Sequence, residues 1–162
     1  MGALLRRALR GAVAGAAGTL AMDLVWYRRY RQGGGTDGFL DWELAAATRG
    51  FADAPAPGRV GQRLYSSLMG RPLPDRYARV TTNLVHWATG VQWGVAYGVA
   101  TRSGGGRPRS GLVLGPVAWG ASYVLLPLLG VYEPIWKYDA ETLGKDLSAH
   151  LVFGTVTSAV AR

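Results

Sequence analysis

Two carboxylates and two imidazoles lie within or at the edges of apolar stretches of this chain, where a charge is costly. They are Asp23, His86, Asp146 and His150. Ionisable groups inside a membrane face the interior of a helix bundle and mark proton or ion pathways. Histidine also titrates near neutral pH, with an ordinary pKa of about 6.5, and its ring nitrogens bind metals. These side chains therefore indicate proton or metal chemistry.

The direction of the helices decides whether these groups can meet. Asp23 lies near the end of the first apolar stretch, and His86 lies near the beginning of the second. Asp146 and His150 lie near the beginning of the fourth. If consecutive helices alternate in direction, all four groups lie at one depth, and Asn83 shares the helix face of His86 because it lies three residues earlier. We therefore predict one polar site made of these five residues.

Two long stretches carry no Asp, Glu, Lys or Arg, one between Val80 and Ala100 and the other between Ser110 and Tyr132. A helix of about 20 residues crosses a bilayer core of about 30 Å, so each stretch is long enough to span. Two further apolar stretches are shorter and carry charge near their ends. The sequence predicts an all-α, four-helix transmembrane bundle as one domain over residues 1–162. The predicted spans are residues 8–27, 79–101, 110–132 and 143–161.

The long connection over residues 28–78 is predicted to lie at the membrane surface. After three glycines, Phe39 and Trp42 indicate a short interfacial helix. Beyond the prolines at 55 and 57, Leu64 and Leu68 recur at helical spacing, with Arg63 on another face. An amphipathic helix that carries arginine is typical of a membrane surface. A small soluble cap is the alternative.

Glycines recur four residues apart in three of the predicted helices. Lipid gives no hydrophobic drive between helices, so they associate through small residues that allow close backbone approach. We therefore predict a tightly packed bundle, although the chain is rich in glycine overall, with 24 of its 162 residues. The predicted packing positions are Gly11, Gly15, Gly90, Gly94, Gly98, Gly111 and Gly115.

The chain is basic, with 18 Lys and Arg against 10 Asp and Glu. Arginines at helix ends reach lipid headgroups, so the predicted partner is the bilayer rather than nucleic acid. The absence of Cys excludes disulfides and Cys-ligated metals. The arginines are nearly balanced between the two sides of the predicted bundle. We expect both termini on one side, the cytoplasmic side, because the other side carries an acidic loop.

Several interpretations of the polar layer stay open. In a structural one, Asp146 and His150 bond to each other and to Asn83 and only fix the helix register. In a proton-linked one, His86 and His150 couple protonation to conformation. In a third interpretation, a divalent metal is held by His86, His150 and Asp146. In a fourth, a haem iron lies between the two imidazoles. No cofactor is predicted.

Motifs of the common enzyme classes are missing from the sequence. There is no glycine-rich phosphate loop after a strand, no His-Glu-x-x-His and no Gly-x-Ser-x-Gly. We therefore expect a non-enzymatic protein with an interior polar cluster that responds to protons. The alternative is a module that binds a membrane partner or a second copy of itself through its glycine-rich helix faces.

Three short motifs resemble the YagU-like group of small bacterial inner-membrane proteins of unknown function. They are Gly11-Ala12-Val13-Ala14-Gly15 running into Met22-Asp23, His86-Trp87-Ala88-Thr89-Gly90 leading to Gly94-Val95-Ala96-Tyr97-Gly98, and an Asp146–His150 helix that ends at Gly154. The resemblance implies a multi-pass protein of the bacterial inner membrane with a role in acid tolerance. It supplies no catalytic residues.

Overall fold

The computed structural model describes residues 2–101 and 108–162, and all regular structure in them is helical. The prediction of an all-α chain is therefore confirmed for the described residues. The long helices are α1 (Ala3–Gln32), α4 (Ala78–Ala100), α5 (Pro108–Leu128) and α6 (Ala140–Val160). The short elements are α2 (Phe39–Glu43), α3 (Ala56–Met69), η1 (Asp75–Tyr77) and η2 (Ile135–Lys137).

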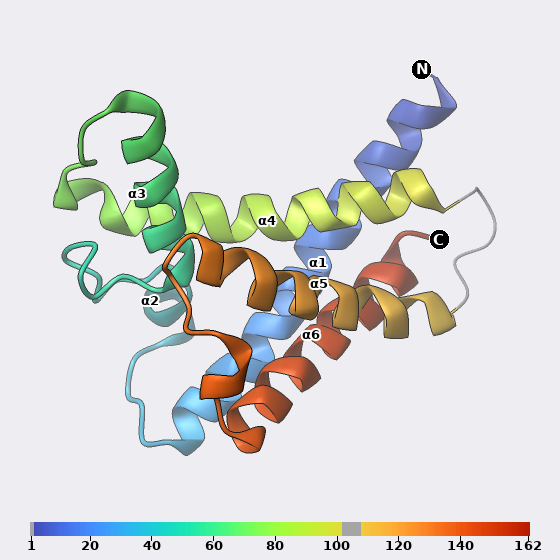
Figure 1. Ribbon diagram of the computed structural model, residues 1–162. Coiled ribbons are helices and arrows are strands. Elements are labelled where there is room, and N and C mark those ends of the chain that lie inside the picture. Colours follow the sequence, from blue (N-terminus) through green and yellow to red (C-terminus); the bar gives the residue numbers. More distant parts are fainter. Residues whose placement is uncertain (1, 102–107) are drawn as a thin grey trace.

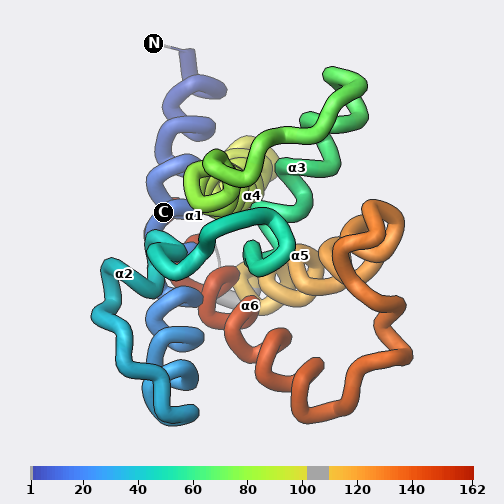
Figure 2. The backbone as a smooth tube through the Cα atoms, turned by 90° about the vertical axis from the view of Figure 1, so that its left-hand side faces the viewer, coloured from blue at the N-terminus to red at the C-terminus, as the bar shows by residue number. Residues whose placement is uncertain are grey.

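Helix α1 is the central element of the structure. It packs against both α4 and α6, while α5 packs against α6 and α3 packs against α4 (Figure 1). The beginning of α1 and the end of α6 lie at one end of the molecule. Helices α2 and α3 and the turn between α5 and α6 lie towards the other end (Figure 1), which faces the viewer in Figure 2.

Three of the long helices differ from their predicted bounds by more than one residue. Helix α1 continues five residues past position 27 and ends before Gly34, whose positive φ of 93° suits glycine. Helix α5 ends at Leu128, so residues 129–132 form a turn instead of the predicted last helical turn. Gly130, with a φ of 62°, reverses the chain there. Helix α6 begins at residue 140 because the Asp139 side chain accepts a hydrogen bond from the Thr142 backbone N–H.

Glycine brings the helix pairs into backbone contact. A Cβ atom on Gly11 or Gly15 of α1 would overlap the carbonyl group of Gly94 or Gly90 of α4. Gly98 meets the α1 backbone in the same way. In the second pair, Gly111 and Gly115 of α5 lie against the α6 backbone around Gly154 and His150. All seven predicted packing glycines are buried.

The connection between α1 and α4 is ordered by aromatic and polar contacts. The rings of Phe39 and Trp42 on α2 lie 5.2 and 5.5 Å from the ring of Tyr27 on α1. Just after α2, the Leu44 carbonyl accepts hydrogen bonds from Arg79 Nε and Asn83 Nδ2 of α4. These contacts hold α2 across the ends of α1 and α4.

Two of the described helices, residues Ala3–Gln32 and Ser110–Leu128, are long and apolar enough to cross a membrane. Most residues in the apolar window of each are not buried inside the fold. Helices α4 and α6 have a span's length, but their first turns carry polar residues such as Arg79, Asn83, Lys145 and Asp146. The structure therefore shows a helical protein with two candidate spans.

We predict that Gly94→Ala destabilises the fold, because the new methyl group would meet the Gly11 carbonyl and the Gly15 backbone. Overpacking of this kind costs about 1–3 kcal/mol. The matched control is Gly120→Ala in α5, where a Cβ meets nothing within 4 Å. Thermal unfolding of both variants in detergent measures the difference. Equal stability of the two variants would contradict the packing described for α1 and α4.

Candidate functional site

A buried carboxylate on α1 is hydrogen-bonded to an imidazole on α4. Asp23 Oδ2 lies 2.9 Å from His86 Nε2. Asp23 is 4% exposed, whereas the His86 side chain keeps 26% of its surface exposed. The pair joins two helices that are 63 residues apart in sequence. The structure thus places two of the predicted site residues in direct contact.

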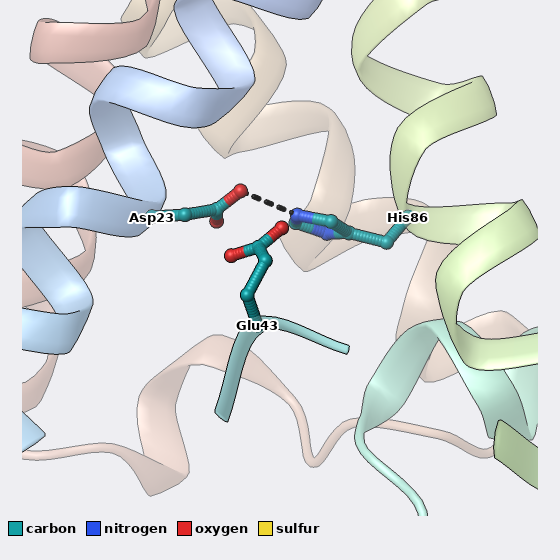
Figure 3. Close-up of side chains that lie close together, drawn as sticks. All are labelled: Asp23, Glu43 and His86. Carbon is teal, nitrogen blue, oxygen red and sulfur yellow. Dashed lines mark hydrogen bonds and ion pairs between the residues drawn. The ribbon is translucent and has the colours of Figure 1, made fainter. Parts of the chain in front are cut away.

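A third side chain, Glu43 of α2, completes the cluster. One ligand atom from each of Asp23, Glu43 and His86 lies within 4.8 Å of the other two. Figure 3 shows the three side chains approaching one another from α1, α2 and α4. Among the described residues, no other group of three His or acidic side chains lies close enough together to hold a metal ion.

The packing of α1 on α4 sets the distance between Asp23 and His86. The two helices are antiparallel, and Gly15 lies against Gly90. One turn further along α1, Thr19 fills the space beside Gly90. Asp23 lies one turn after Thr19 on α1, and His86 lies one turn before Gly90 on α4. The two side chains therefore lie opposite each other. A larger residue at either glycine would separate the two helices, and with them the two side chains.

Burial and the neighbouring carboxylate change the acidity of Glu43. Loss of hydration, followed by the negative charge of Asp23, raises the pKa of Glu43 from 4.5 to about 7. The positive charge of protonated His86 acts in the opposite direction. One Glu43 oxygen, Oε1, is buried without a hydrogen-bond partner. The cluster therefore holds two acidic groups, and one of their oxygens lacks a hydrogen-bond donor.

The second imidazole forms a separate pair within α6. His150 Nδ1 lies 3.0 Å from the backbone carbonyl oxygen of Asp146 and 3.3 Å from the side-chain Oδ1 of Asp146. Tyr123 of α5 also interacts with Asp146. Each histidine therefore has its own carboxylate, and the group able to hold a metal contains neither His150 nor Asp146. The predicted layer is divided between two helix pairs.

Asn83 positions the connection rather than the cluster. Its Nδ2 donates to the carbonyl of Leu44, the residue after Glu43, and to the carbonyl of Arg79. The side chain therefore fixes the end of α2 beside α4. In this way Asn83 affects the site through the backbone that carries Glu43.

Glu43 is the site residue that the sequence reasoning missed. The sequence feature that could have identified Glu43 is its position on α2. Phe39 and Glu43 are four residues apart and therefore share a helix face. Phe39, Trp42 and Glu43 are partly buried, whereas Leu40 and Asp41 are exposed. An acidic residue on the aromatic face of a short helix was the available clue. It could not show which helix that face would contact.

Comparison of the chain with protein-family models, curated proteins and solved structures gives no match. The resemblance to the YagU-like group stays a prediction, and so does the role in acid tolerance that it implies.

We predict that His86→Ala is more destabilising than His150→Ala. The first variant leaves the buried Asp23 carboxylate without its imidazole partner, and loss of a hydrogen bond to a charged group costs about 1.5–3 kcal/mol. The second removes one partner of Asp146, which keeps Tyr123 nearby. Thermal unfolding at neutral pH measures both. His86→Gln, which retains a donor, should recover part of the loss, and equal losses for the two alanine variants would rule out a special role for the Asp23 pair.

Proposed function

We propose that this chain is a four-span membrane protein that holds a small cation, a proton or a metal ion, at Asp23, Glu43 and His86. The observation that carries the proposal is the approach of two carboxylates and one imidazole within 4.8 Å around a carboxylate that is 4% exposed. Two like charges at this distance in a poorly hydrated site repel strongly. A bound cation removes that repulsion.

The outer surface of the long helices supports the membrane part of the proposal. Large apolar side chains are exposed along α1, α4 and α5, and exposed apolar surface of this kind marks contact with a membrane or another protein. Aromatic and basic side chains follow at the end of α1, as is typical of a membrane interface. The exposed apolar side chains on three of the long helices include Val13, Leu20, Leu24, Val80, Leu84, Leu112, Val113, Val117, Val124, Leu125 and Leu128.

The cluster also joins the surface connection to the transmembrane helices. Asp23 and His86 come from α1 and α4, whereas Glu43 comes from a five-residue helix in the connection. A cation between them links α2 to the helix pair, and loss of the cation weakens that link. The proposed role is therefore a non-enzymatic one, in which cation occupancy controls the position of the connection. A role in acid tolerance, which the resemblance implies, is the case in which the cation is a proton.

Packing by glycine makes the assembly alternative weaker. Gly11, Gly15, Gly90 and Gly94 are buried between α1 and α4, and Gly111 and Gly115 are buried against α6. These faces are therefore occupied within the chain. A partner or a second copy would need another surface.

We predict that metal-free protein loses stability as the pH rises from about 5 to about 8, and that Glu43→Gln reduces this loss. The pKa of folded Glu43 is about 7 and its ordinary value is 4.5, so the folded state binds the proton more tightly. This contribution is full below the ordinary pKa and is lost as the pH passes through 7. Because Glu43 is only partly buried, we expect an effect on the order of 1 kcal/mol, or about 2–4 °C in Tm.

Thermal unfolding with a chelator present, across that pH range, measures the effect. Asp41→Asn is the matched control, because Asp41 lies on α2 but is exposed. It should follow the wild type. If the wild type and Glu43→Gln show the same dependence on pH, the cluster does not take up a proton through Glu43.

We also predict the arrangement of the chain across the membrane. The natural chain has no Cys, so single cysteines can be introduced at exposed positions in otherwise unreactive protein. Leu4→Cys and Arg162→Cys should react with a membrane-impermeant thiol reagent from one side only. Leu40→Cys and Trp136→Cys should react from the opposite side, because these residues lie on α2 and in the turn between α5 and α6. Equal reactivity of all four positions in intact cells would disprove the four-span arrangement.

A further inference from the structure

We propose that the cation held by Asp23, Glu43 and His86 is a divalent transition-metal ion such as Zn²⁺ or Mn²⁺. This inference rests on the proposed function, which requires a cation at the cluster but does not say which one. The chemistry of the ligands, their arrangement and the charge of the site each support it.

The ligand set is one imidazole nitrogen and two carboxylate oxygens. Calcium and magnesium prefer ligands that are all oxygen, whereas copper(I) prefers sulfur. Imidazole together with carboxylate suits zinc, manganese and iron(II). Three protein ligands also leave at least one position for water, as in open metal sites.

The arrangement of the ligand atoms is close to what a metal requires. Ligands around a tetrahedral zinc ion lie roughly 3.4 Å apart, given metal–ligand distances of about 2.0–2.1 Å. Asp23 Oδ2 and His86 Nε2 are 2.9 Å apart, and the widest separation in the cluster is within 4.8 Å. A small movement of Glu43 is therefore enough to enclose an ion.

Glu43 is the ligand best able to make that movement. It lies on a five-residue helix in the connection, and its Oε1 is buried without a hydrogen-bond partner. Asp23, by contrast, is fixed within the α1–α4 contact with 6% of its side chain exposed. The rigid pair provides two ligands, and the connection brings the third.

Charge balance favours a divalent ion over a monovalent one. Two carboxylates and a neutral imidazole carry a total charge of −2, which one divalent ion neutralises. On binding, the ion takes the place of the proton between His86 Nε2 and Asp23 Oδ2, and that proton and any proton on Glu43 are released to water. Metal binding therefore releases protons and weakens at low pH.

The test is a metal titration of the full chain, purified in detergent and stripped with a chelator that is then removed. Mn²⁺ binding is followed by the loss of the free-ion signal in electron paramagnetic resonance, and Zn²⁺ is tested by competition. The wild type should bind one equivalent that Zn²⁺ displaces. Asp23→Asn and Glu43→Gln should weaken binding by at least about 100-fold, since loss of outer-shell partners alone costs about 10–100-fold.

Two variants at the second histidine pair serve as matched controls. His150→Ala and Asp146→Asn remove the same types of side chain outside the cluster, so both should keep wild-type affinity. If Asp23→Asn does not fold, Glu43→Gln tests the site alone, because it lies outside the α1–α4 contact. Absence of saturable binding in the wild type, or affinity unchanged in Glu43→Gln, would overturn the metal proposal.

The two proposals can fail separately. If no metal binds but the stability of metal-free protein still depends on Glu43 and pH, the cluster holds a proton and only the metal inference is lost. If neither metal nor pH acts through Glu43, the proposed function is lost as well.

Discussion

The close approach of α1 to α4 is the constraint on which the rest of the structure depends. Gly15 and Gly90 bring the two backbones into contact, and no side chain separates them. In lipid, where burial of apolar surface gives no net drive, such contacts supply the packing energy between helices. The same register places Asp23 opposite His86 two turns beyond Gly15 on α1. Helix association and the polar pair therefore have one structural cause.

The site combines a rigid part with an adaptable one. Asp23 and His86 are held by long helices, whereas Glu43 depends on aromatic contacts of α2 and on two hydrogen bonds to the Leu44 carbonyl. Burial of the Glu43 carboxyl near Asp23 raises its pKa to about 7, close to physiological pH. If the cluster holds a cation as proposed, a change in cation supply or pH acts first on the connection, while the α1–α4 pair stays in place.

The helix pair formed by α5 and α6 repeats the packing but not the site. Gly111 and Gly115 face the α6 backbone as Gly11 and Gly15 face α4. Its histidine, His150, binds a carboxylate of its own helix, and within the part of the chain that the structure describes no second acidic side chain joins the pair to form a metal-binding group. A local pair at i and i+4 fixes one helix face. The Asp23 pair, in contrast, ties together segments far apart in sequence.

The sequence alone determined the helical class, the long helices and the position of each polar group along its helix, because a helix rises 1.5 Å per residue. That is why Asp23 and His86 were expected in one layer. Only the tertiary structure decided that Glu43 joins them and that His150 pairs within α6. Rotation of each helix about its axis and the path of the long connection come from contacts between distant segments, which numbering does not fix.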